Sequence, residues 1–159
     1  MSHYGASEEQ RALALAQTAL SARDRTESEL RSILERKRVE PEAIDYAVDE
    51  LKAAGLLDDA RFAQCFAEDK RVLERWGPER IERELRRRGV PAELVEGAMR
   101  ERERGQELSA ALELLAERMP QPAASDRERD RAWRLLVRKG YDTELAYEAV
   151  RAHGRREAA

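Results

Sequence analysis

The amino-acid sequence predicts an all-α protein, an expectation that rests on its composition and on an internal repeat. Charged residues make up 40% of the 159-residue chain, against about 25% in an average soluble domain. Alanine and leucine dominate the uncharged residues, a composition typical of long helices. With only 8 Gly, 5 Pro and 5% aromatic residues, the chain lacks the turns and β-formers that a β-sandwich or β-barrel needs.

The internal repeat has a period of 51 residues. The residues that recur at this spacing include Leu34, Leu85 and Leu136; Val39, Val90 and Tyr141; Glu42, Glu93 and Glu144; and Ala47, Ala98 and Ala149. Self-similarity at a fixed period is typical of arrays in which each unit packs on its neighbours. We therefore expect three tandem three-helix repeats, over residues 1–57, 58–105 and 106–159, in an elongated, curved row.

In the first repeat we expect helices over residues 8–22, 26–37 and 41–54. Thr26 and Glu29 have the S/T-x-x-E spacing of a capping box, which satisfies two backbone amides at a helix N-terminus. The third helix begins at a proline, and the glycine that follows it suits a C-terminal cap. The proline is Pro41 and the glycine is Gly55. The apolar residues expected to form the buried stripe of this helix are Ala43 or Ile44, Ala47, Val48 and Leu51.

The second repeat opens at Asp58 and Asp59, whose carboxylates suit a helix N-terminus better than a metal site. Its first helix is expected to run to the Gly-Pro break at residues 77–78. Trp76 and Ile81 flank this break at the two positions of a hydrophobic staple. The staple would set the direction in which the chain enters the next helix.

Further helices are expected over residues 78–88 and from 91 toward 103. The third repeat should contain a helix over about residues 107–118, followed by a linker over 119–125 that is rich in proline and small residues. Two more helices then lie on either side of Gly140. This pattern completes three helices in each repeat.

The sequence argues against an enzyme, a metal centre and a membrane protein. His3, His153 and Cys65 are too few for a Cys/His zinc site, and we expect no metal and no cofactor. The histidines lie near the ends of the chain, where frayed termini are expected, and Cys65 should be a buried, inert thiol. No apolar stretch is long enough to span a membrane and no signal peptide is evident, so we expect a cytoplasmic protein.

Two arginine faces are the strongest candidates for binding. Both lie on the polar side of a predicted helix, at equivalent positions 51 residues apart. The second-repeat face comprises Arg80, Arg83 and Arg87, with Arg88 beside it; the third-repeat face comprises Arg131, Arg134 and Arg138, with Lys139 beside it. Guanidinium groups suit phosphate or carboxylate recognition, although the alternative is ordinary solvated charge in an arginine-rich chain. The next candidate helix carries Arg61, Lys70, Arg71 and Arg75.

The central repeat resembles the signature of the RecX family, the regulators of the bacterial recombinase RecA. The similar segments are residues 55–63, with Phe66 and Arg71 downstream, and residues 77–81, 84–86 and 88–90. Residues 23–30 and 126–141 are similar to the family's first and last repeats. The resemblance implies a non-enzymatic helical protein that lies in the groove of the RecA–single-stranded DNA filament. Such proteins restrain RecA's ATP hydrolysis, coprotease action and strand exchange, and so modulate recombination and the SOS response.

Two features of the sequence differ from what this resemblance implies. Arg38 stands where the other repeats have Gly89 and Gly140, so the first repeat's turn is expected to differ. The net charge of −3 argues against strong binding to free DNA, so single-stranded DNA would be contacted mainly through the filament, by a monomer. A helix-turn-helix DNA-binding protein and a generic helical scaffold remain as alternatives, although glutamates interrupt every candidate recognition helix.

Overall fold

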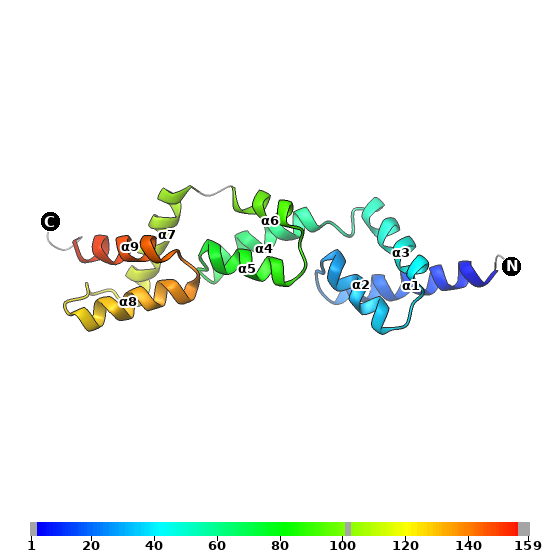
Figure 1. Ribbon diagram of the computed structural model, residues 1–159, viewed down its shortest axis with the longest axis horizontal. Coiled ribbons are helices and arrows are strands. Elements are labelled where there is room, and N and C mark those ends of the chain that lie inside the picture. The colour runs from blue at the N-terminus through cyan, green and yellow to red at the C-terminus, as the bar shows by residue number, and fades with distance from the viewer. Residues whose placement is uncertain (1–2, 101–102, 156–159) are drawn as a thin grey trace. The chain divides into compact units, whose positions relative to one another are not determined.

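The computed structural model describes residues 3–100 and 103–155, and this part of the chain contains nine α-helices and no strand (Figure 1). The all-α class is therefore confirmed. The chain forms two units by its internal contacts: residues up to 65 with 85–95, and residues 66–84 with those from 96 onward. The division into three repeats stays a prediction. Within the described ranges no helix is long and apolar enough to cross a membrane.

In the first unit, α1 (His3–Ala22) packs against α2 (Glu27–Arg36) and α3 (Pro41–Ala53). α1 begins earlier than the expected residue 8. The predicted stripe of α3 is buried and meets the apolar sides of the other two helices. The core residues of these three helices are Ala12, Ala16, Leu30, Leu34, Ala43, Ile44, Ala47, Val48 and Leu51.

The predicted ends of these helices are confirmed. The Thr26 side chain accepts a hydrogen bond from the Glu29 amide at 3.2 Å, and the Glu29 carboxylate accepts one from the Thr26 amide at 3.1 Å. Pro41 occupies the first turn of α3, and Gly55 follows this helix with a φ of 70°. A left-handed residue at this position lets the chain turn away while the last carbonyls are satisfied.

The central helices are α4 (Asp59–Leu73), α5 (Pro78–Arg87) and α6 (Ala92–Met99). Asp58 accepts a hydrogen bond from the Arg61 amide at 3.0 Å, so it caps α4 as predicted. The expectation for Cys65 is wrong, because this thiol is exposed. Ala63 and Ala67, one helical turn apart, form the buried side of α4, and Cys65 projects from another side.

In the second unit, α9 (Thr143–Arg155) packs against α7 (Arg104–Arg118) and α8 (Asp126–Lys139). α7 begins earlier than the expected residue 107, because Glu103 and Gln106 form a capping box. The predicted linker over residues 119–125 is not helical. The core residues include Ala111, Leu114, Leu115, Ala132, Leu136, Tyr141, Leu145, Ala146 and Ala149.

The expectation that His153 lies in a frayed terminus is also wrong. Its side chain is buried, and Nε2 donates a hydrogen bond to the Met119 carbonyl oxygen at 2.9 Å. The packing of α9 on α7 places the imidazole beside the end of α7, where an unpaired carbonyl needs a donor. His153 therefore has a structural role.

The turns after α2, α5 and α8 share one conformation, so the expected difference at Arg38 is wrong. Arg38 has a φ of 57°, whereas Gly89 and Gly140 have values of 81° and 97°. In each turn the amide of the following residue donates to a buried leucine's carbonyl at 3.1 Å; the pairs are Val39 to Leu34, Val90 to Leu85 and Tyr141 to Leu136. The 51-residue repeat therefore extends to backbone hydrogen bonds.

Candidate functional site

Contacts between helix ends position the candidate arginines, and the first set lies within the first unit. The Thr26 hydroxyl, at the N-terminus of α2, donates to the Arg88 carbonyl oxygen at 2.7 Å, just after α5. A Cβ atom added to Gly89 would lie 2.5 Å from the Ser28 side chain. The turn after α5 therefore contacts the start of α2 so closely that only glycine fits.

The second unit contains the same contact 51 residues later. The Gly77 amide, before α5, donates to the Lys139 carbonyl oxygen at 2.7 Å, and the Glu79 amide donates to Gly140 at 3.0 Å. A Cβ atom on Gly140 would overlap the Arg80 side chain and backbone. This contact brings Arg80 of α5 next to the last turn of α8, so two of the predicted arginine positions are neighbours.

Arg88 is held within the first of these contacts. Its guanidinium group pairs with Glu29 at 2.7 Å and lies 4.6 Å from the centre of the Phe62 ring. Burial raises the pKa of Glu29, but the hydrogen bonds from Arg88 and from the Thr26 amide outweigh it and leave the pKa below its usual value. The Arg88 side chain is only 14% exposed, so it helps to hold the turn after α5 against α2, and its role in binding a partner stays a prediction.

Arg80 and Lys139 are held in a similar way in the second unit. The Arg80 guanidinium lies 4.0 Å from the centre of the Trp76 ring and donates to the Arg138 carbonyl at 3.3 Å. Lys139 donates to the Glu74 carbonyl at 2.8 Å. Burial lowers the pKa of Lys139, and the charges of Arg118 and Arg80 lower it further. The charge of Glu74 raises the pKa of Lys139 but does not outweigh these effects, so positive charge predominates around the start of α5 and the ends of α7 and α8.

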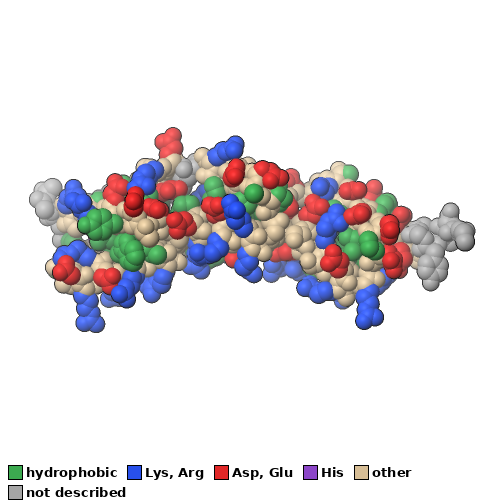
Figure 2. Space-filling view, in the orientation of Figure 1, with side chains coloured by type: hydrophobic (Ala, Val, Ile, Leu, Met, Phe, Trp, Pro, Cys, Tyr) green, Lys and Arg blue, Asp and Glu red, His purple; other side chains and the backbone are tan. Residues whose placement is uncertain are grey.

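The third-repeat arginine face is exposed along α8, where Lys and Arg side chains gather in Figure 2. Arg134 pairs with Asp130 at 2.9 Å. Arg131 and Arg138 line a cavity of about 170 Å³ together with Arg118 of α7. The sequence reasoning missed Arg118 because the equivalent position 51 residues earlier is Ala67. The signal that could have found it is its place in the last turn of a helix, where a basic residue is favoured.

On the second-repeat face, Arg83 and Arg87 are exposed on α5. Arg83 forms no ion pair or hydrogen bond with a residue that the structure describes. Arg87 borders a cavity of about 280 Å³ that also involves Arg25, Arg36 and Arg88. Arg36 lies 51 residues before Arg87, at the equivalent position of the first repeat.

The alternative arginines on α4 are engaged within the protein. Arg61 donates to the Gly55 carbonyl at 3.0 Å, and Arg71 donates to the Ala98 carbonyl at 3.1 Å. Arg75, which follows α4, pairs with both Glu113 and Glu117; Lys70 pairs with Glu74. These contacts hold the side chains within the protein, and their role in binding a partner stays a prediction.

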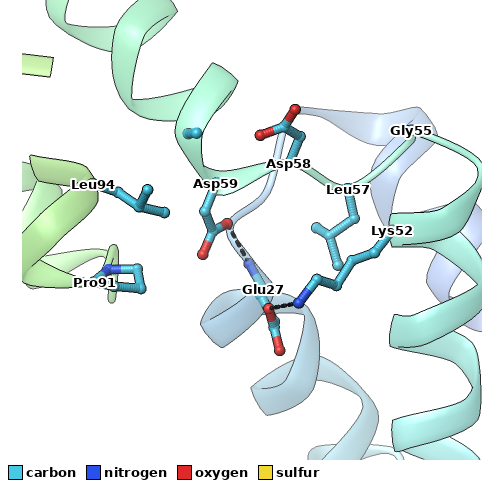
Figure 3. Close-up of a pocket in the computed structure, with 9 residues that line it drawn as sticks. Glu27, Lys52, Gly55, Leu57, Asp58, Asp59, Pro91 and Leu94 are labelled. Atoms are coloured by element: carbon cyan, nitrogen blue, oxygen red, sulfur yellow. Dashed lines mark hydrogen bonds and ion pairs between the residues drawn. The ribbon is translucent and has the colours of Figure 1, made fainter. Parts of the chain in front are cut away.

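A separate pocket of about 360 Å³ in the first unit is lined by acidic and apolar residues (Figure 3). Asp59 accepts a hydrogen bond from the Glu27 amide at 2.9 Å, and Lys52 pairs with Glu27 at 3.2 Å. Burial and the charges of Glu27 and Asp58 raise the pKa of Asp59. Within the described residues, no group of three or more His, Cys, Asp or Glu side chains could hold a metal ion. The polar contacts of Asp59 and Lys52 here connect α2, α3 and α4.

Comparisons with known proteins agree with the helical repeat. The model of the first three-helix domain of RecX matches residues 12–51, and the model of the second matches residues 58–99. The regulatory protein RecX of Deinococcus radiodurans is 36% identical over 146 residues, which cover 91% of this chain and 70% of the relative. That of Mycolicibacterium vanbaalenii is 35% identical over 152 residues, covering 90% of this chain and 82% of the relative.

Solved structures show the same fold. The crystal structure of RecX from Lactobacillus salivarius has a TM-score of 0.81 at 18% sequence identity, and the similarity covers 93% of this chain and 97% of that one. A second crystal structure of a regulatory protein RecX has a TM-score of 0.77 at 20% identity, covering 94% of this chain and 74% of that one. The matched domain models span more than half of the chain, and the relatives match most of it, so this protein belongs to the RecX family.

Proposed function

We propose that this protein binds the RecA filament on single-stranded DNA, in its groove, and restrains ATP hydrolysis, strand exchange and the SOS response. It acts by binding and not by catalysis, as a cytoplasmic monomer without a cofactor. Membership of a family of regulatory proteins supports the role. The resemblance of the central repeat to RecX regulators supplies the partner.

The exposed arginines of α5 and α8 carry the proposal. Arg83, Arg131 and Arg138 are exposed and form no ion pair or hydrogen bond with any described residue. Folding needs no arginine at such positions, since exposed charges contribute little to stability. Outward-facing guanidinium groups attract acidic protein surfaces and phosphates, and they speed the encounter with a filament that carries both.

Restraint of RecA follows from binding at several points. Tandem repeats present arginines on more than one helix, so one chain can contact neighbouring subunits of the filament. A bound chain would oppose relative movements of those subunits during ATP hydrolysis. Occupation of the groove would also keep a second DNA from entering for strand exchange.

The test is inhibition of RecA's ATPase on single-stranded DNA by Arg131→Glu and Arg138→Glu variants. Each reversal should raise the inhibitory concentration about tenfold, because a favourable charge contact becomes repulsive. Inhibition by the wild type should weaken as salt rises. The matched control is Arg129→Glu, a reversal on the same helix at a residue that pairs with Asp126. Equal inhibition by all variants would remove the third-repeat face from the interface.

A binding experiment with the purified protein distinguishes a filament regulator from a transcription factor and from a scaffold. Labelled single-stranded DNA, with and without RecA, and a labelled duplex are titrated at two salt concentrations. A filament regulator requires RecA for tight binding. Tight binding to one duplex sequence would instead assign the protein to transcription factors, and failure to bind RecA or DNA would make it a scaffold.

A further inference from the structure

We propose that Arg118, Arg131 and Arg138 form a phosphate-binding site in the third repeat. The site takes a phosphoryl oxyanion, either a phosphodiester of single-stranded DNA or a free phosphate. This inference rests on the proposed function, which already uses Arg131 and Arg138; it names the class of ligand that they bind and adds Arg118, which lies outside both arginine faces.

The geometry is that of a small cavity with a cationic rim. Arg118 and Met119, at the end of α7, face Arg131, Leu135 and Arg138 of α8 around a volume of about 170 Å³. All three arginines are exposed, whereas Met119 and Leu135 are half-buried. An anion can therefore enter from solvent and reach three guanidinium groups from two helices.

The carboxylates that could neutralise Arg131 and Arg138 are engaged elsewhere. Glu128, one turn before Arg131, accepts hydrogen bonds from the Ala124 amide at 2.8 Å and the Ser125 amide at 3.1 Å. Asp142, one turn after Arg138, accepts bonds from two amides at the start of α9. Asp130 pairs with Arg134. Asp126, at the start of α8, pairs with Arg129, so the described acidic side chains within α8 are engaged by partners other than Arg131 and Arg138.

Arg118 is uncompensated for a similar reason. Arg75 pairs with both Glu113 and Glu117, the acidic residues of the last two turns of α7 before Arg118. As a result, none of the three arginines forms an ion pair or hydrogen bond with a described residue. The positive potential also reaches Lys139, because burial and the charges of Arg118 and Arg80 lower its pKa by more than the charge of Glu74 raises it. An anion in the cavity would relieve this repulsion.

Phosphate fits the site better than a carboxylate does. A guanidinium group donates two parallel hydrogen bonds to an oxyanion, so three such groups can share the several oxygens of one phosphate. A carboxylate has only two oxygens to offer. The half-buried Leu135 and Met119 provide an apolar surface beside the phosphate, as a sugar or an adjacent methylene group would require.

The experiment measures binding to the full chain without RecA. The probes are pyrophosphate, followed by thermal shift and by NMR of arginine Nε–H groups, and a labelled oligothymidine, followed by anisotropy. An oligothymidine with an uncharged methylphosphonate backbone is the ligand control. Arg118→Gln and Arg138→Gln should each weaken binding about tenfold, the size expected for one charge-assisted hydrogen bond. Arg129→Gln has the same charge change and should bind as the wild type does.

The outcomes separate the sources of the ligand. Binding of oligothymidine but not pyrophosphate supports a DNA backbone ligand, and the reverse supports a free phosphate. Failure of both to bind, or equal weakening by Arg118→Gln and Arg129→Gln, overturns the site. Because RecA is absent, intact phosphate binding alongside failed RecA inhibition would count against the proposed function only.

Discussion

At the scale of single residues, Arg38 occupies a backbone conformation that favours glycine. A left-handed conformation costs a residue with a Cβ atom about 1 kcal/mol. The hydrogen bond from the Val39 amide to the Leu34 carbonyl keeps the turn in place despite this cost. The side chain of Arg38 is exposed, so substitution there changes the backbone preference with little effect on packing.

Arg38→Gly should therefore raise the free energy of unfolding by about 0.5–1 kcal/mol, as glycine adopts the left-handed region without strain. Urea denaturation measures the change. Gly89→Ala is the opposite control, since its Cβ would meet Ser28 and stability should fall. A loss of stability in Arg38→Gly would show that this side chain makes a contact of its own.

Residue-level expectations from the sequence fail where burial depends on a tertiary partner. Cys65 stands beside Phe66, which suggests an apolar environment, yet Ala63 and Ala67 define the buried side of α4. His153 is near the end of the chain, but the Met119 carbonyl gives it a partner from another helix. Neither outcome can be read from neighbouring residues, because helical periodicity does not identify which helix packs against which.

At the scale of helices, their ends are fixed by specific side chains. Capping boxes begin α2, α7 and α8. The sequence predicts the first from Thr26 and Glu29, and the same spacing in Ser125 and Glu128 could have identified the start of α8. The capping box at α7 has Glu103 at its N-cap position. The S/T-x-x-E pattern does not include a glutamate at that position.

The capping box at α2 should make the free energy of unfolding depend on pH. Because the pKa of Glu29 is lowered in the folded protein, its contribution is present above its ordinary pKa of 4.5 and is lost as the pH falls through the folded value. Between pH 7 and pH 3, Glu29→Gln should lose less stability than the wild type, as measured by urea midpoints.

Asp59→Asn provides a control of opposite sign. Burial raises the pKa of Asp59, so its charge opposes folding at neutral pH and protonation removes this penalty. Asp59→Asn should therefore lose more free energy of unfolding than the wild type as the pH falls. Parallel pH profiles for wild type and Glu29→Gln would contradict the role assigned to the Glu29–Arg88 pair.

At the scale of the whole molecule, the 51-residue period applies to contacts as well as residue types. Thr26 and Gly77 are equivalent positions that donate to the equivalent carbonyls of Arg88 and Lys139. The sequence predicts the repeat but not this bond, because one donor is a hydroxyl and the other a backbone amide. The arginine cavity is also hidden from the sequence, since Arg118 has no counterpart at the repeat spacing.

The predicted division into three repeats implies that truncating a core residue destabilises mainly the repeat that contains it. Leu136 is fully buried in the third repeat, and Leu136→Ala should cost about 2–5 kcal/mol there. Hydrogen exchange should speed up most in α7–α9 and least in α1–α3, as in repeat arrays whose units interact only with neighbours. Leu34→Ala should give the reverse pattern. Uniform acceleration in both variants would mean that the chain unfolds as one unit.

The turn at Arg38 also bears on how far each repeat depends on another for its hydrogen bonds. After α5 and α8, the last carbonyl is bonded by an earlier repeat, across a contact that leaves no room for a Cβ atom. After α2, the equivalent Lys37 carbonyl is bonded at 2.9 Å by Arg11 from the same repeat's α1. The first repeat thus satisfies its last α2 carbonyl by itself, whereas each of the two later turns depends on a donor from an earlier repeat. The turn at Arg38 is therefore the one of these three that could keep its hydrogen bonds if its repeat were expressed alone.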